Sequence, residues 1–470
     1  MGKSGSGGPV EDEFKKSEIQ SKNRIESRII EAWSMNCRVL GTSFQAKTAA
    51  EIVMLPKKKS FLPRGNGQSF GDVSLPNRGI SLSLGPSFEL TKFFLDESTG
   101  IMVCPAGMTQ RDVLERIVPR GWILPVIPGS AKITIGGAVA ADAHGKNHYS
   151  KGALSDHIID LNIFCASGQT VSATRSEYSD LFWATIGGLG LTGVILTVTL
   201  QLQPAAASHV YQKVKVFCGI REMLETIEVE KDNGDFLLGA VDGDFSPASE
   251  WRGQISIANF MSIPGEGKAI TFSMGKPLAV PKLVGRLNAG AFSTWALNKA
   301  IFISTRHKRK GEISLDKFFF PQDALGEWNR LFGVNGFIDY QVCIPLENAE
   351  EFLGKLQKFL NQYSVKCFLV AIKRMRKSAN LNPLSFGQEG ISIALGLPIR
   401  RSTKDQLDYL DEMTILFGGR VNLIKDARLQ RECFNRMYPR KDQWVATKLK
   451  YDPQGRIRSK MSARLGLDSI

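Results

Sequence analysis

The residue types that could carry chemistry gather in one stretch of the chain, Pro128 to His148. The stretch contains a glycine pair and a run of small residues, and His144, Lys146 and Asn147 follow that run. Small side chains let a backbone approach a flat or charged ligand, because nothing protrudes from Cβ. Histidine, lysine and asparagine donate hydrogen bonds to polar ligands. The combination predicts that a large cofactor lies across this stretch and that its substrate meets it near His144.

A second loop with binding character runs from Arg64 to Asp72 and reads RGNGQSFGD. A glycine-rich loop can point backbone N–H groups at phosphate oxygens, and Arg64 can add a positive charge. The same composition is typical of a plain surface turn. Composition alone therefore leaves both interpretations open.

A third glycine-rich segment, residues 187–193, contains a formal G-x-G-x-x-G. In a nicotinamide-binding fold this motif follows a strand and opens a helix. Here it follows a helical pattern over 179–186 and precedes a β-branched strand pattern over 194–200. The order is reversed, which excludes the Rossmann interpretation. The sequence also lacks the G-x-x-x-x-G-K-[ST] signature of a phosphate-binding P-loop.

The length and the charge of the chain limit the number of domains and the classes of partner that can be expected. A chain of 470 residues is too long for one ordinary core, so two domains are expected. The net charge of +14 fits nucleic acid, an anionic membrane surface or a phosphorylated substrate as partner, but also a merely solvated basic surface. None of the usual nucleic-acid-binding motifs is present, so no nucleic-acid partner is expected.

The seven cysteines are odd in number and show no C-x-x-C spacing, which argues against a disulfide framework and against a zinc site. Most of them lie in apolar strings, where a buried free thiol is expected. No metal is predicted. The N-terminus shows no signal peptide, and no run reaches about 18 apolar residues, so a cytoplasmic protein is expected.

The elements that must position these residues follow from periodicity. In the first half, strands are predicted at 80–84, 101–104, 158–165, 170–173 and 194–200, and helices at 17–35, 109–119 and 179–186. After a composition break at 204–208, strands are predicted at 211–217, 365–373 and 391–398, helices at 349–361 and 404–417, and a mobile loop between 253 and 311. This pattern is typical of an α+β fold with a mostly antiparallel sheet in the second half.

Several separated motifs resemble one family. They are RGNGQSFGD, PGSAKITIGGAVAADAHGKNH and LFWATIGGLGLTGVI in that order, then GEWNR at 326–330, YQVCIP at 340–345, NPLSF at 382–386, IKDAR at 424–428 and MYPR at 437–440. The chain resembles the vanillyl-alcohol oxidase/para-cresol methylhydroxylase type of FAD-binding protein, in particular its branch that oxidises lipid-linked ribose. The resemblance covers roughly residues 45 to 465 and is weakest over 205–315.

The resemblance implies a domain arrangement. A two-lobed FAD-binding domain would occupy residues 17–204, after a disordered arm at 1–16. A substrate-binding domain with a mostly antiparallel sheet flanked by helices would occupy 205–403. The segment 404–470 would return to the FAD domain and the active site.

The resemblance also implies roles for individual residues. Lys425 matches the essential lysine of the family and His144 a second catalytic position. Implied substrate contacts are Gln341, Lys373, Ser392 and Phe319. Implied FAD contacts are Arg64, Gly65, Asn66, Gly67, Gln68, Ser69, Phe70, Gly71, Asp72, Gly129, Thr134, Ile135, Gly136, Gly137, Ala141, Asp142, Ala143, His144, Ile195 and Asn422.

The chain departs from the family pattern at a few positions. Ala394 stands where the branch has a cysteine, Ser392 where it has an asparagine, and Phe70 and Phe319 where it has tyrosines. Relatives that attach the flavin covalently through the first loop commonly carry histidine at the position of Gln68. An amide cannot form that bond, so FAD is expected to be non-covalent.

The implied reaction is FAD-dependent oxidation of the 2'-hydroxyl of a polyprenylphosphoryl-β-D-ribose to a ketone. It would be the first half of an epimerisation to the arabinose donor, completed by a separate NADH-dependent short-chain reductase. Lys425 would hold the developing alkoxide or act as base. The basic segment Arg306 to Lys310 would either meet anionic headgroups at the inner face of the membrane or form a solvated loop. The alternatives are an alditol or aldonolactone oxidase of soluble polyols, and a non-enzymatic basic binding protein.

Overall fold

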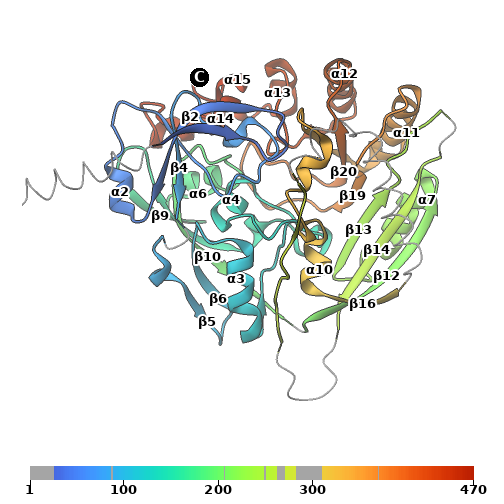
Figure 1. Cartoon of the computed structure of the whole chain (residues 1–470), viewed down its shortest axis with the longest axis horizontal. Helices are drawn as coiled ribbons and strands as arrows, with labels where there is room; N and C mark the ends of the chain where they lie inside the picture. Colours follow the sequence, from blue (N-terminus) through green and yellow to red (C-terminus); the bar gives the residue numbers. More distant parts are fainter. Residues whose placement is uncertain are drawn as a thin grey trace, which may run out of the picture.

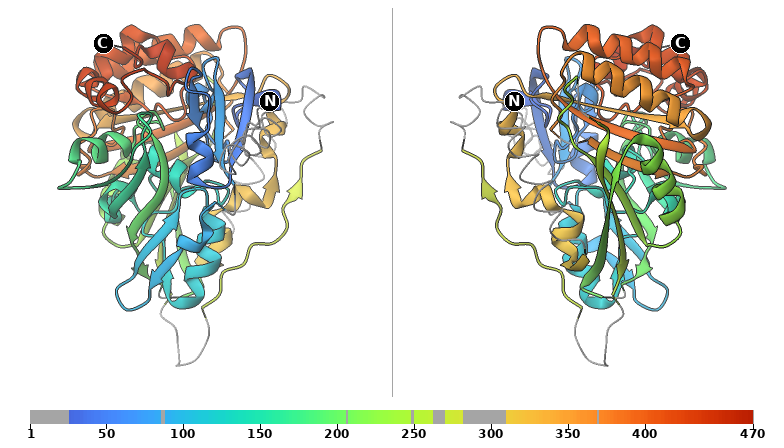
Figure 2. Two further views of the ribbon diagram at one scale, coloured as in Figure 1. Left: turned by 90° about the vertical axis from the view of Figure 1, so that its left-hand side faces the viewer. Right: turned by 90° about the vertical axis from the view of Figure 1, so that its right-hand side faces the viewer.

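The computed structural model describes residues 26–85, 88–205, 207–247, 250–261, 270–281, 310–368 and 370–469. Helices and mostly antiparallel sheets alternate along the chain, as expected for an α+β fold. Two small sheets come from the N-terminal half and one large sheet from the second half (Figure 1). The C-terminal helices lie above both halves (Figure 2).

The first small sheet has the order β1-β2-β4-β3. Its strands are β1 (Glu26–Glu31), β2 (Arg38–Ala46), β4 (Ile80–Leu84) and β3 (Phe61–Pro63). The helix predicted over 17–35 is wrong where the chain is described, because 26–31 form an antiparallel ladder with β2. The ladder places Ile29 opposite Leu40, and paired apolar side chains of this kind favour a strand. The strand predicted at 80–84 is confirmed.

The second small sheet is antiparallel, with the order β5-β6-β10-β8-β9. Its strands are β5 (Phe94–Asp96), β6 (Ile101–Pro105), β10 (Val194–Gln201), β8 (Ile158–Phe164) and β9 (Thr170–Thr174). They confirm the strands predicted there. The predicted helices follow as α3 (Gln110–Ile117) and α6 (Ser179–Thr185). Thr109 caps α3 in a reciprocal pair with Asp112.

The large sheet is antiparallel throughout, with the order β16-β12-β14-β13-β19-β20-β18-β21. Its strands are β16 (Lys310–Ser314), β12 (His209–Cys218), β14 (Arg252–Phe260), β13 (Phe236–Val241), β19 (Val370–Met375), β20 (Gly390–Pro398), β18 (Phe337–Pro345) and β21 (Arg420–Val421). The helices packed beside it are α7 (Ile220–Glu230), α11 (Leu346–Gln362) and α12 (Thr403–Leu416).

Two predictions for the second half need correction. The mobile loop predicted over 253–311 is wrong at its start, because 252–260 form β14, whose residues pair on both sides with β12 and β13. Residues 262–269 and 282–309 lie outside the described ranges. The strand predicted at 365–373 begins later, at Val370. Its first residues instead bridge to the turn after β13, at Asp244 and Lys366.

Shorter elements complete the described chain. The helical ones are α2 (Ala49–Val53), η1 (Asp72–Ser74), η2 (Leu90–Lys92), η3 (Val118–Arg120), α4 (Ile135–Ala140), α5 (His148–Lys151), η4 (Leu154–Asp156), α10 (Leu315–Phe319), η5 (Pro321–Ala324) and η6 (Trp328–Phe332). The short strands are β7 (Trp122–Ile123), β11 (Gln203–Pro204), β15 (Leu278–Ala279) and β17 (Leu325–Gly326). In the described ranges, no helix has both the length and the apolar character that crossing a membrane requires.

The C-terminal segment ties the two halves together. It forms α13 (Arg431–Met437), α14 (Lys441–Tyr451) and α15 (Lys460–Leu465). The indole N–H of Trp444 donates to the carbonyl of Ala184 at 2.9 Å, which joins α14 to α6. The guanidinium of Arg464 pairs with Asp72 and Asp426, each at 2.8 Å. The last fifty residues therefore pack against the N-terminal half, far away in the sequence.

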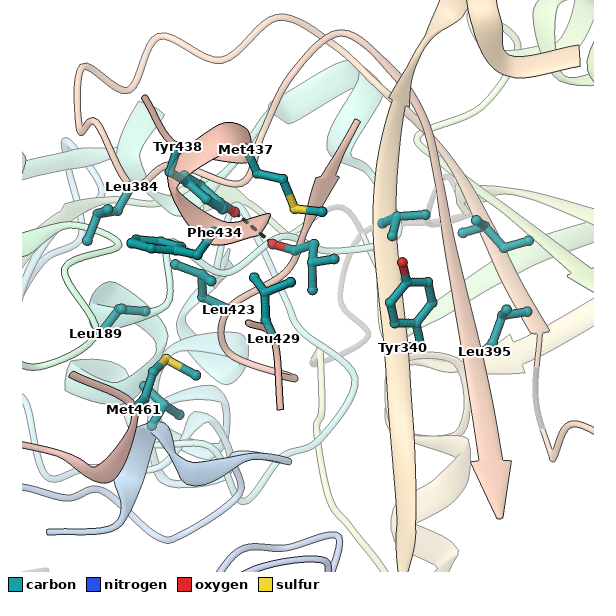
Figure 3. Close-up of a cluster of buried hydrophobic side chains, with 14 of the residues drawn as sticks. Leu189, Tyr340, Leu384, Leu395, Leu423, Leu429, Phe434, Met437, Tyr438 and Met461 are labelled. Carbon is teal, nitrogen blue, oxygen red and sulfur yellow. Dashed lines mark hydrogen bonds between the residues drawn. The ribbon is translucent and has the colours of Figure 1, made fainter. Parts of the chain in front are cut away.

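The core runs through the junction between these parts. Figure 3 shows Leu423, Leu429 and Phe434 of the C-terminal segment packed beside Tyr438, whose hydroxyl donates to the carbonyl of Val421 at 2.7 Å. None of the seven cysteines, all of them in the described part of the chain, forms a disulfide. Five are buried, which confirms the prediction for most of them. These are Cys104, Cys165, Cys343, Cys367 and Cys433.

Candidate active site

One face of the large sheet carries polar side chains on three adjacent strands. Lys373 of β19 lies opposite Ser392 of β20, which lies opposite Cys343 of β18. Gln341 is two residues from Cys343 and therefore shares its face, since side chains alternate along a strand. Tyr340 points the other way and hydrogen-bonds through its hydroxyl to Asp411 and Thr414 of α12.

Gln341 is buried and links three parts of the chain. Its amide nitrogen donates to Ser392 Oγ at 2.9 Å and lies 3.4 Å from His144 Nε2. Its amide oxygen accepts from the side chain of Asn422 at 3.0 Å. The N-terminal stretch, the sheet and the C-terminal segment therefore meet at one amide.

His144 lies between this amide and a lysine. The Nζ of Lys373 is 3.2 Å from His144 Nδ1. Burial, followed by the charge of Lys373, holds the pKa of His144 well below its usual value, so the imidazole is neutral. Burial and the nearby Lys425 lower the pKa of Lys373 to about 7.

A neutral imidazole has one N–H and can accept at only one nitrogen. With Gln341 donating to Nε2, the proton is on Nδ1 and faces an uncharged Lys373 amine. With Lys373 charged, Nδ1 accepts and the proton moves to Nε2. The tautomer of His144 is therefore coupled to the charge of Lys373.

Lys425 approaches the same site from the turn after β21. Its Nζ pairs with the carboxylate of Asp339 at 2.6 Å, and it lies 5.3 Å from the ring centre of Phe70. Asp339 is on β18, two residues from Gln341, and so faces the same way. The ion pair places a cation beside the neutral imidazole.

The loop side of the site is built from small residues. The side chain of Thr134 accepts from the N–H of Gly137 at the start of α4, and that short helix ends at Ala140. Asp142 follows in a left-handed conformation, with φ of 41°. Its carboxylate is turned into the protein, where it accepts from Ser155 and from Asn380. Contact of Asp142 with a cofactor would therefore have to involve its backbone.

The first glycine-rich loop lies against this segment. Asn66 donates to the carbonyl of Lys132 at 3.1 Å, and a Cβ on Gly65 would lie 2.3 Å from Thr134 Oγ1. Among the residues that the structure describes, the N–H groups of Gly65 and Asn66 have no acceptor, and the buried Nε of Arg64 has no partner. Burial lowers the pKa of Arg64 to about 10. Unsatisfied donors of this kind fit a pyrophosphate.

Not every implied cofactor residue presents its side chain to this loop. Asp72 is buried and paired with Arg464. Ile195 is buried within β10, opposite Ile163 of β8. A Cβ on Gly71 would lie 1.7 Å from the carbonyl oxygen of Asp426, so this glycine permits contact between two chain segments.

A pocket with an empty volume of about 440 Å³ lies where the loop side meets the C-terminal segment. Its walls include several of the expected residues and others that were not expected. They are Ala141, Asp142, His144, His148, Ala153, Gly187, Leu189, Met375, Leu384, Ser385, Phe386, Gly387, Asn422, Leu423 and Ile424. The remaining expected FAD positions lie in the first glycine-rich loop (Gln68, Ser69) and in the segment around α4 (Gly129, Ile135, Gly136, Ala143).

Phe319 does not join the polar cluster. It is buried among Phe236, Phe318 and Phe320, which makes it part of an aromatic core. Replacement of a tyrosine by phenylalanine suits that apolar surrounding.

Four contributors to the site were given no role on the basis of the sequence. Asp339 is hidden in an ordinary strand pattern, although its spacing from Gln341 could have indicated it. His148 lies 5.8 Å from His144 between ring centres, and Phe386 stacks on His144 at 6.1 Å. Lys146 was noted as a donor but was given no role.

Comparison with known proteins identifies the cofactor. Residues 45–174 match the FAD binding domain family. Decaprenylphosphoryl-beta-D-ribose oxidase of Mycolicibacterium smegmatis is 29% identical over 419 residues, which are 87% of this chain and 90% of that protein. An uncharacterised protein of Streptomyces coelicolor is 29% identical over 376 residues, 77% of this chain and 100% of that protein. L-gulonolactone oxidase of Mus musculus is 22% identical over 416 residues, with 83% and 86% covered.

Proposed function

We propose, on the premise that this chain is an FAD-dependent oxidoreductase acting on a CH–OH group, that its substrate is a polyprenylphosphoryl-β-D-ribose. The product would be the 2'-ketone, the first half of an epimerisation to the arabinose donor. The similarity to a protein named for oxidation of a lipid-linked ribose, over 90% of that protein, supports this substrate class. The observation that carries the proposal is the contact of His144 with Gln341 and Lys373, next to a sheet face on which Asp339 holds Lys425 in an ion pair.

The chemistry divides between cofactor and chain. FAD, when bound, accepts the hydride from the alcohol carbon. The chain must bind the hydroxyl and remove its proton. His144 is a neutral imidazole, and its Nε2 can accept that proton once the substrate hydroxyl displaces the 3.4 Å contact of the Gln341 amide. Lys425, paired with Asp339, is a fixed cation that stabilises developing negative charge on the oxygen.

The proposed division of labour follows the chain. Residues 17–204 would hold FAD, residues 205–403 would hold the substrate through Gln341, Lys373 and Ser392, and residues 404–470 would bring Lys425 and Asn422 to the flavin. Attachment would be non-covalent, because the side chain of Gln68 is an amide. That amide donates to the carbonyl of Asn66 at 3.2 Å, within its own loop.

The test is anaerobic mixing of the FAD-loaded protein with a short-chain polyprenylphosphoryl-β-D-ribose while the flavin absorbance is followed. Rapid bleaching and recovery of the 2'-keto sugar are the expected results. Bleaching by L-gulono-lactone or alditols, with none by the phosphoryl ribose, would replace the proposal by the soluble-polyol alternative. The lactone is the appropriate comparison substrate, because L-gulonolactone oxidase is 22% identical to this chain.

The reductase partner and the membrane contact are separate proposals. A short-chain reductase with NADH should convert the released ketone to the arabinose epimer, and its omission should leave the ketone. Most of the basic segment considered for headgroup contact, residues 306–309, lies outside the described ranges. Co-sedimentation with anionic vesicles, compared with neutral ones, tests the membrane contact.

A further inference from the structure

A second pocket lies beside the candidate active site, with an empty volume of about 270 Å³. Lys146, Lys373 and Arg374 line it, together with Asp235 and Lys231. It shares a wall with the first pocket, because His148 lines both. The shared wall places this second pocket next to the imidazole proposed to accept the proton.

Lys146 and Lys373 both lack a carboxylate partner within the described ranges. The Nζ of Lys146 donates to the carbonyl of Phe318 and lies 4.4 Å from the centre of that ring. The Nζ of Lys373 contacts His144 Nδ1 at 3.2 Å. Both side chains are half-buried, between the loop side of the site and the sheet.

The other charged groups of this pocket already have partners. Lys231 pairs with Glu228 at 2.7 Å. Arg374 pairs with Glu228 at 2.7 Å and with Glu389 at 3.3 Å. The carboxylate of Asp235 accepts from the backbone N–H of Phe260 at 2.9 Å.

Two half-buried ammonium groups that line one pocket are unfavourable without a counter-charge. Burial lowers the pKa of Lys146 to about 8, and Lys373 is affected in the same direction, which shows the cost of charging both. An anion placed between them removes that cost and gains charge-assisted hydrogen bonds.

We propose that Lys146 and Lys373 form a subsite for a phosphoryl oxyanion, next to the oxidation centre. This inference rests on the proposed function and adds to it the group by which the substrate is selected. The phosphoryl group of a glycosyl phosphodiester and free inorganic phosphate share the required chemistry. In the first case the subsite holds the phosphodiester while the sugar hydroxyl meets His144 and Lys425.

The first arm of the test compares two ribosides, a farnesylphosphoryl-β-D-ribose and an uncharged alkyl β-D-ribofuranoside. The variant is Lys146→Met, which removes the charge and shortens the side chain by one atom. The preference in kcat/KM for the phosphorylated riboside should fall roughly 10- to 100-fold, through KM more than kcat. Lys151→Met removes an exposed charge from the same segment and should leave the preference unchanged.

The second arm needs no turnover and therefore separates this inference from the proposed function. Methyl phosphate and inorganic phosphate are titrated into the FAD-loaded protein, and binding is followed by flavin difference spectra and by ³¹P line broadening. Methyl phosphate is expected to bind saturably. Its binding should weaken at least tenfold in Lys146→Met and should not weaken in Lys151→Met.

The outcomes distinguish the possible sources of the phosphoryl group. A lost substrate preference together with weakened methyl phosphate binding supports a substrate subsite. Weakened phosphate binding without oxidation of either riboside refutes the proposed function but leaves the anion site. Weakened binding of inorganic phosphate alone, with substrate preference intact, overturns the substrate subsite. Unchanged binding and preference in a variant that keeps its flavin content and Tm overturn the site itself.

Discussion

The two sides of the candidate site are built in opposite ways. The loop side comes from a continuous stretch around residues 134–148, in which small residues and backbone groups dominate. The sheet side comes from Asp339, Gln341, Lys373 and Ser392, on three strands separated by tens of residues. The loop side is held by backbone hydrogen bonds and glycine contacts, and the sheet side by side-chain hydrogen bonds and one ion pair.

The difference teaches what each side contributes. Small residues and free N–H groups make a surface that binds a large, flat and anionic cofactor but has little chemistry of its own. The sheet side offers an amide, a hydroxyl and cations in fixed positions, because a β-sheet holds side chains at regular spacing. Cofactor binding should therefore depend on the loops, and the reaction on the sheet and Lys425.

Loss of the Lys425 charge should give the largest effect and should separate the two sides most clearly. Lys425→Met should retain FAD and slow flavin reduction by substrate by ~10²–10⁴-fold, because a fixed cation at a developing charge is lost. Single-turnover absorbance under anaerobic conditions measures this rate. Lys441→Met, which lies outside the site, is the matched control. A rate within twofold of the wild type would remove Lys425 from the mechanism.

A methyl group at Gly71 should damage the loop side through the fold. Because its Cβ would lie 1.7 Å from the Asp426 carbonyl, Gly71→Ala should lower the free energy of unfolding by about 2–4 kcal/mol and release FAD. Chemical denaturation and flavin content measure both effects. Gly354, in α11, has nothing within 4 Å of its Cβ position, so Gly354→Ala should stabilise by about 0.5–1 kcal/mol. Equal stabilities for these two variants would contradict the contact.

The pH dependence should appear on the sheet side. Burial lowers the pKa of Lys373 to about 7 and that of Lys146 to about 8, so both lose their charge as pH rises through this range. Below pH 7 both can bind an anion. The KM of a phosphorylated riboside should therefore increase roughly tenfold or more between pH 6.5 and 9, since each lost charge weakens the anion contact. A KM for this substrate that does not change with pH would contradict anion binding by the two lysines. An equal increase in KM for an uncharged riboside would contradict it as well.

A methyl group at Gly129 tests the cofactor directly and should have the smallest effect on the protein. No atom lies within 4 Å of its Cβ position, so Gly129→Ala should leave the free energy of unfolding of the flavin-free protein unchanged. Any loss of FAD affinity would then come from contact with the cofactor. If FAD lies there, its Kd should increase about 3- to 10-fold, because the added methyl group would prevent FAD from approaching the backbone closely. Unchanged affinity would place FAD elsewhere.

Local patterns predicted much of the fold. The apolar alternation at Ile80–Leu84 and the apolar spacings of α3 and α11 depend on neighbours in sequence, and the elements that they predicted were confirmed. The error at 26–31 has a tertiary cause, because the partner strand β2 satisfies the backbone groups there. The aromatic surroundings of Phe319 in α10 could not be predicted for a similar reason, since Phe236 of β13, far away in the sequence, packs against it.

The sequence by itself determined the chemistry available to this protein. It contains the small-residue stretch before His144, the glycine-rich loop after Arg64 and a glycine motif in the order that excludes a Rossmann site. Those features depend on side-chain size and on the order of residues, which a sequence states directly.

Only the tertiary structure decided which of these groups act together. The register of three strands places Gln341 beside Ser392, and the return of the C-terminal segment places Lys425 against Asp339. It also leaves Lys146 and Lys373 without acidic partners in the described chain and directs the Asp142 carboxylate to Ser155 and Asn380. Register and long-range packing arise from contacts between distant residues, so burial, charge and pKa at this site exist only in the folded chain.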